Sequence, residues 1–71
     1  MRFGHFCLPS FYAEQDGDVG VFMRRLVDFF VDSEDLGFDA LWANEHHYHA
    51  YGGLVPSPPM MLCAFAQRTR R

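Results

Sequence analysis

Residues 38–48 read FDALWANEHHY and decide the fold of this chain. The first six of them form a short apolar run in which apolar and polar residues do not alternate cleanly. Such a run is typical of a strand buried on both faces of a parallel sheet. We therefore predict a strand over residues of about 38–44. A polar and aromatic loop follows, and it begins with Asn44, Glu45, His46 and His47.

A second strand is predicted at the N-terminus, over residues of about 2–8. It alternates weakly, and both sides of the alternation are mostly apolar, so it is also expected to be buried on both faces. Pro9 and Ser10 end it. Residues 11–18 are polar and predict a loop that closes with a helix N-cap, at Asp16 or Asp18.

Helical periodicity lies between the two strands and after the second one. Apolar residues recur at helical spacing from Val19, which predicts a helix over residues of about 19–36. Gly37 follows it, at the position that a left-handed cap prefers. A second helix is predicted over residues of about 58–70, with Ser57 as its cap and Pro58 in its first position. This helix is apolar on more than one side.

The order strand, helix, strand, helix predicts a parallel sheet with right-handed crossovers. Two helices cannot cover both faces of such a sheet, and a complete (β/α)₈ barrel needs about 250 residues. We therefore assign the α/β class and interpret residues 1–71 as the N-terminal two βα units of a parallel (β/α)₈ TIM-type barrel. Trp42 and the phenylalanines are expected in its core. His5 is expected to be a satisfied, partly buried histidine near the barrel mouth.

Composition and charge exclude several classes of function. The net charge is −3 with no lysine, so no basic surface for nucleic acid is expected. The terminal arginines, Arg68, Arg70 and Arg71, are interpreted as cations that complement the macrodipole of the last helix. No signal peptide or membrane-spanning run is recognisable, which predicts a cytoplasmic protein with no membrane contact. Cys7 and Cys63 are expected to be buried thiols rather than a disulfide.

The residues best placed for chemistry follow the second strand, because the sites of parallel α/β folds lie beyond the carboxyl ends of the strands. If the strand geometry continues, Glu45, His47 and His49 point one way and His46 points the other. A metal site would use His47 and His49, whereas proton transfer or ligand contact would use His46. The spacing leaves both alternatives open. Gly52 and Gly53 are expected to act as loop hinges.

Four segments together resemble the N-terminus of the bacterial luciferase-like flavin monooxygenases. They are Met1–Phe6, then Glu34–Trp42 with its GFDALW run, then Glu45–Tyr48 (EHHY), and finally the helix that begins at Pro58 and ends in QRTRR. The similarity runs along nearly the whole chain, in order and at similar spacing.

This resemblance implies a barrel enzyme that uses reduced FMN, supplied by a separate flavin reductase, and O₂ to oxidise a small organic substrate such as an aldehyde. It implies that His46 is catalytic and lies in the flavin pocket, with Phe6, Leu8 and Glu45 as further cofactor neighbours. It also implies a homo- or heterodimer through the helix of residues 58–70, with His47 near the interface. The later segments that bind the flavin phosphate are absent from these residues, so the 71-residue fragment alone is expected to be inactive.

Three alternatives remain at this point. The first is a deazaflavin-dependent oxidoreductase on the same fold. The second is a metal-dependent hydrolase that uses His47 and His49, and the third is a non-catalytic partner subunit or remnant.

Overall fold

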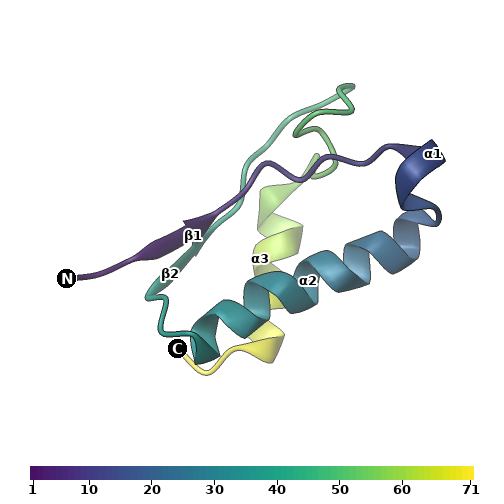
Figure 1. The fold of residues 1–71 in the computed structure, drawn as a ribbon. Helices are drawn as coiled ribbons and strands as arrows, with labels where there is room; N and C mark the ends of the chain where they lie inside the picture. The colour runs from purple at the N-terminus through teal and green to yellow at the C-terminus, as the bar shows by residue number, and fades with distance from the viewer.

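The computed structural model describes residues 1–71 as two short parallel strands and three helices. In chain order these are β1 (Gly4–Phe6), α1 (Ala13–Asp16), α2 (Val19–Asp35), β2 (Ala40–Trp42) and α3 (Pro58–Arg68). Figure 1 shows the long α2 crossing beneath the strand pair, with α3 packed beside it. Strand, helix, strand and helix thus follow one another as predicted, and the strands are shorter than the runs of residues 2–8 and 38–44.

The strands pair in parallel, with Gly4 opposite Ala40, His5 opposite Leu41 and Phe6 opposite Trp42. A parallel pair joined by a helix confirms the α/β class and is consistent with the start of a luciferase-like barrel, whose closure stays a prediction. Only the face that carries His5 and Leu41 is covered by helices. We call the other face, formed by Gly4, Phe6, Ala40 and Trp42, the open face.

The expectation that both strands are buried on both faces is therefore wrong for the open face. Phe6 is 54% exposed and Trp42 is 61% exposed, so Trp42 does not belong to the core. Two other phenylalanines, Phe3 and Phe29, are exposed as well. The physical reason is the period of a strand: neighbouring side chains point to opposite faces, and both helices pack on the same one.

The core lies between α2, α3 and the covered face of the sheet. Its buried apolar side chains are Leu26, Phe30, Val55, Met61 and Phe65. Phe30 and Phe65 pack ring against ring, with centroids 5.0 Å apart. The two helices that carry them are therefore held together mainly by apolar contact.

Helix ends follow the sequence signals in part. The Asp18 carboxylate accepts a hydrogen bond of 2.9 Å from the Val21 N–H, so Asp18 is the cap of α2. Asp16 instead accepts from the Tyr12 N–H at 2.8 Å and closes the short helix α1, which replaces the predicted loop. Gly37 adopts the left-handed conformation, with φ of +94°, after α2 as predicted.

The Ser57 side chain makes no capping hydrogen bond, contrary to prediction. Pro58 and Pro59 lack the N–H groups of the first turn, and the next two amides bond to the Ser57 carbonyl instead.

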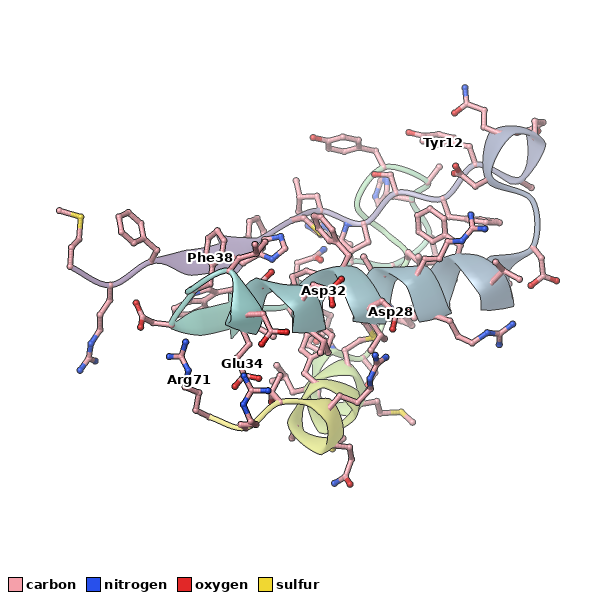
Figure 2. All side chains as sticks on the ribbon, turned by 60° about the horizontal axis from the view of Figure 1, so that its bottom comes forward. Tyr12, Asp28, Asp32, Glu34, Phe38 and Arg71 are labelled. Carbon is pink, nitrogen blue, oxygen red and sulfur yellow. The ribbon has the colours of Figure 1, made fainter.

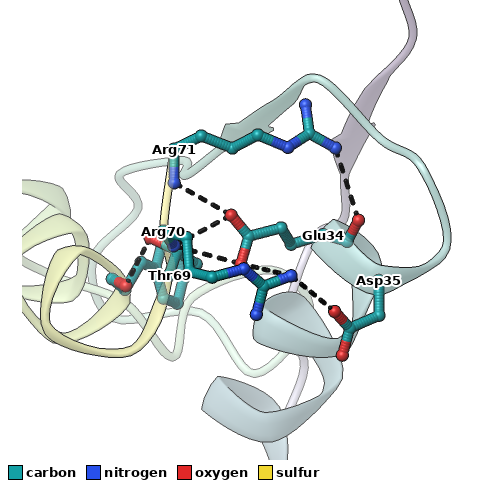
Figure 3. A network of polar contacts seen from close by, with 6 residues as sticks. Glu34, Asp35, Thr69, Arg70 and Arg71 are labelled. Atoms are coloured by element: carbon teal, nitrogen blue, oxygen red, sulfur yellow. Dashed lines mark hydrogen bonds and ion pairs between the residues drawn. The ribbon is translucent and has the colours of Figure 1, made fainter.

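The terminal arginines bind the acidic side of α2 rather than only complementing a macrodipole. The buried Glu34 carboxylate accepts hydrogen bonds of 2.9 Å from the backbone N–H groups of Arg70 and Arg71 (Figure 3). Arg70 also pairs with Asp35 at 2.9 Å, and this bond together with the charge of Glu34 raises the pKa of the Arg70 guanidinium. Figure 2 shows Arg71 reaching α2 at Glu34 from the end of the chain.

The two cysteines are free thiols in different surroundings. Cys7 is half-buried, and burial raises the pKa of its thiol. Cys63 is exposed on α3, so the expectation that it is buried is wrong. In addition, none of the helices combines the length and apolar character needed to cross a bilayer.

Candidate active site

The carboxyl ends of β1 and β2 lie at one edge of the sheet because the strands are parallel and in register. Phe6 and Trp42 are the last residues of the two strands and face each other across the pair. The loop of residues 43–57 leaves from this edge and folds back to α3, beside the segment that follows β1 (Figure 1). The predicted site cluster thus stands where parallel α/β folds place their sites.

Hydrogen bonds fix this loop to the end of β1. The Asn44 side-chain amide donates to the Gly52 carbonyl at 2.8 Å, and the Gly52 N–H donates to Ser10 Oγ at 2.7 Å. Ser10 Oγ in turn donates to the Leu8 carbonyl at 3.2 Å. A further bond of 3.4 Å runs from the Leu54 N–H to the Pro9 carbonyl. The loop is therefore tied at several points to residues 8–10.

The two loop glycines each meet a conformational requirement of their own, and their role as loop hinges stays a prediction. Gly52 is buried with φ of +70°, and a Cβ there would lie 3.4 Å from Leu8 Cβ. A Cβ on Gly53 would lie 1.9 Å from the His49 carbonyl oxygen, a distance that no side chain tolerates. Position 52 therefore favours glycine because of its positive φ, since the contact with Leu8 would be an ordinary one, whereas position 53 requires glycine because of close approach.

Glu45 and His47 point the same way, as the strand-like alternation predicts. His47 Nε2 lies 3.1 Å from Glu45 Oε2, and both side chains are about half exposed, 49% for His47 and 60% for Glu45. A pair this exposed contributes little to stability, but it occupies both side chains. The predicted contact of Glu45 with a cofactor would require Glu45 to release or share its partner.

His46 stands apart from this pair. Its backbone N–H donates to the Val55 carbonyl at 3.4 Å, which fixes the main chain on the buried Val55. Its imidazole is exposed and makes no hydrogen bond within the chain. Both ring nitrogens are therefore free to bind a ligand or to exchange a proton.

The two predicted cofactor neighbours on β1 lie at the same edge. The Phe6 ring is exposed on the open face, and Leu8 packs against Gly52 of the loop. Leu8 thereby connects the end of β1 to the loop that carries His46. The structure brings the predicted site residues to one edge of the sheet, although only Glu45 and His47 touch through polar atoms.

Trp42 forms part of this open face in a way that the sequence does not reveal. Its indole lies directly over Gly4 of the neighbouring strand, where a Cβ would be 2.5 Å from Trp42 Nε1. Only glycine allows the indole this position. Trp42 thus lines a hollow of about 480 Å³ together with Phe3, Gly4 and Ala40, among others.

His5 faces the opposite side, away from the open face. Its Nδ1 makes a short hydrogen bond with Ser33 Oγ, and its ring packs on Phe29, Phe30 and Phe38. His5 is therefore a satisfied, partly buried histidine as expected, and it lies against α2; its expected place near the mouth of a barrel stays a prediction.

The histidines do not assemble a metal site. No group of three or more His, Cys, Asp or Glu side chains is placed to hold an ion, and His47 is paired with Glu45. His49 lies at the tight turn that ends at Gly53. The fold therefore places no set of further ligand side chains beside His47 and His49.

Sequence reasoning missed Asn44 and Ser10, which hold the loop. Asn44 Oδ1 is also the one buried side-chain oxygen or nitrogen without a hydrogen-bond partner. A polar residue at each strand end is the only sequence signal for these two residues, and it does not identify their partners. The bond between Gly52 and Ser10 spans 42 positions, which no local pattern can reveal.

Comparison with known proteins places the whole chain in one group. Residues 1–71 match the profile of the luciferase-like monooxygenases. The chain is 35% identical to limonene 1,2-monooxygenase of Rhodococcus erythropolis, over 97% of its own length and 17% of the length of that relative. It thus spans about a sixth of the curated relative. No solved structure matches the chain. The resemblance inferred from the sequence is confirmed.

Proposed function

This chain belongs to the luciferase-like monooxygenase family, and from this membership we propose that it forms the first part of a flavin-dependent monooxygenase. The enzyme would use reduced FMN and O₂ to oxidise a small, apolar organic substrate. The observation that carries the proposal is the free imidazole of His46 at the carboxyl edge of the sheet, beside a pair, Glu45 and His47, that leaves it unengaged.

The residues present fit part of a flavin site. The open face offers exposed aromatic rings, Phe6 and Trp42, next to the edge where His46 stands. Flat apolar surface of this kind suits a flavin ring or an apolar substrate. Phe6, Leu8, Glu45 and His46 are the residues that would hold the flavin at this edge of the sheet. Reduced flavin, when bound, supplies the electrons and activates O₂ for the transfer.

The chain's own residues have two tasks in this proposal. The imidazole of His46 takes or gives one proton at Nδ1 or Nε2, the role that histidine most often has in general acid–base catalysis. Phe6, Leu8 and Trp42 exclude water from the reacting atoms. Water exclusion strengthens every polar interaction in the site and limits side reactions.

The name of the relative suggests a first substrate to test. Limonene is apolar, so it suits the aromatic open face better than a charged substrate would. An aliphatic aldehyde remains the second candidate substrate. We propose that a separate flavin reductase supplies reduced FMN, that the protein acts in the cytoplasm, and that it dimerises through α3. The exposed Met60 and Leu62 on α3 support that interface.

The test is His46→Ala in the protein expressed from its full reading frame, with a flavin reductase and either limonene or an aldehyde. We expect kcat to fall by about 10²- to 10⁴-fold, the typical contribution of a general acid or base. His49→Ala is the matched control, because it removes a neighbouring exposed histidine that has no proposed role. Unchanged turnover in His46→Ala would contradict the proposed role of His46.

A further inference from the structure

We infer that Asn44 and Ser10 are positioning residues, which hold His46 at the carboxyl edge of the sheet through a chain of hydrogen bonds. This inference rests on the proposed function of His46. It adds to that proposal two residues that contact neither substrate nor cofactor. The chain of bonds runs from Asn44 to Gly52, then to Ser10, and ends at Leu8.

We call this chain of hydrogen bonds, from Asn44 through Gly52 and Ser10 to Leu8, the relay. It joins the ends of both strands through the loop. Asn44 stands two residues before His46 and two residues after the end of β2. Its amide holds the Gly52 carbonyl at 2.8 Å, and the Gly52 N–H reaches Ser10 Oγ at 2.7 Å. Both the N–H and the carbonyl of Gly52 are thus hydrogen-bonded to side chains. The loop on which His46 stands is therefore tied to residue 10, beyond the end of β1.

Packing and further backbone hydrogen bonds support the loop segments that the relay joins. Gly52 is buried, has φ of +70° and lies beside Leu8, so that a Cβ added to it would be 3.4 Å from Leu8 Cβ. On the return path, the Leu54 N–H binds Pro9, and the His46 N–H binds Val55, which is a core residue. The main chain of His46 is thus held from both sides of the loop, while its imidazole stays free.

Asn44 keeps this position although one of its polar atoms is unsatisfied. Asn44 Oδ1 is buried and has no partner, a condition that costs free energy. An exception of this kind in a folded chain calls for an explanation. The polar contact that Asn44 does make is the bond from its amide to the Gly52 carbonyl.

The consequence for catalysis is geometric. A small displacement of a catalytic group lowers kcat strongly, whereas substrate affinity changes little if the binding surface is intact. The aromatic part of the binding surface, Phe6 and Trp42, takes no part in the relay, which meets the proposed site only at Leu8, through the Leu8 backbone carbonyl. Loss of the relay should therefore lower kcat far more than it raises KM.

The experiment compares three serine variants of the protein expressed from its full reading frame. Ser10→Ala removes the acceptor for Gly52, Ser10→Thr keeps a hydroxyl, and Ser57→Ala removes a serine whose side chain caps nothing. For Ser10→Ala we expect hydrogen exchange of the Gly52 amide to become at least about tenfold faster, because its bond is lost. We also expect kcat to fall about tenfold with KM changed less than about threefold. Ser10→Thr should restore both values, and Ser57→Ala should change neither.

Asn44→Asp tests the other end of the relay with an almost unchanged shape. The carboxylate cannot donate to the Gly52 carbonyl, so the same fall in kcat is expected. Unchanged kcat in both Ser10→Ala and Asn44→Asp would overturn the inference, and so would unchanged exchange of the Gly52 amide. If His46→Ala abolishes turnover while these variants do not, the proposed function stands and the relay fails. If His46→Ala leaves turnover intact, both fail.

Discussion

Phe30 and Phe29 are adjacent in α2 but differ sharply in burial, and this difference gives a quantitative prediction. Phe30 is 2% exposed and packs on Phe65 and on His5, with centroid distances of 5.0 Å and 4.7 Å. Phe29 is 55% exposed and meets His5 at its edge. The same substitution at the two positions should therefore have very different effects on the free energy of unfolding.

The magnitudes follow from burial. Phe30→Ala removes a fully buried ring and leaves a cavity between the helices, which typically costs about 3–5 kcal/mol. Phe29→Ala removes a ring with about half of its surface already in water, so about 1 kcal/mol is expected from the transfer of the remainder. Native proteins are stable by only about 5–15 kcal/mol in total, so Phe30→Ala removes a large share of that stability.

The assay is urea unfolding followed by far-ultraviolet circular dichroism, with the midpoint and slope fitted for each variant. Phe30→Leu is a milder variant that keeps the measurement possible if Phe30→Ala does not fold; it should cost more than Phe29→Leu. Equal losses at the two positions, within about 0.5 kcal/mol, would refute the reasoning from burial.

Three further predictions concern the open face, the thiols and α3. Gly4→Ala should displace the indole of Trp42, the single tryptophan of the chain, and change its fluorescence emission, because the new Cβ would lie 2.5 Å from Nε1; unchanged emission would show that the indole does not rest on Gly4. Iodoacetamide should alkylate Cys63 before Cys7, since Cys63 is exposed and burial raises the pKa of the Cys7 thiol. The Cys7 rate should rise only at a pH above the ordinary thiol range, because a raised pKa leaves less thiolate at any given pH; mass spectrometry of the two peptides over a pH series checks this, and equal rates would contradict it. Met60→Lys should weaken the proposed dimer through α3 by at least about tenfold in sedimentation equilibrium, because the exposed Met60 would then bring a charge into an apolar contact; an unchanged dimer would exclude this face of α3.

Local sequence signals predict the helices and strands of this chain well. The helical spacing that starts at Val19 and the glycine at position 37 mark the two ends of α2, and the structure has α2 over Val19–Asp35. Pro58 likewise marks the start of α3, because the fixed φ of proline suits the first turn of a helix. The alternation after β2 also separates His46 from Glu45 and His47. These features depend on residues a few positions apart.

Which face of the sheet is covered is a property of the packing. Phe6, Trp42 and Leu41 are all apolar, so the sequence cannot tell that only Leu41 packs on the helices. The answer depends on the direction in which α2 returns across the strands. For this reason Trp42, which is expected in the core, lies on the exposed face of the sheet instead.

The sequence by itself determined the order of strands and helices, the family, and the edge where the functional residues gather, because periodicity, caps and motifs are local. The tertiary structure alone decided how that edge is held. Glu34 accepts the backbone N–H groups of residues 70 and 71, and Ser10 accepts that of Gly52, across separations of 36 to 42 positions. Hydrogen bonds between residues so far apart in the sequence depend on the core to bring the two segments together, so no local pattern encodes them.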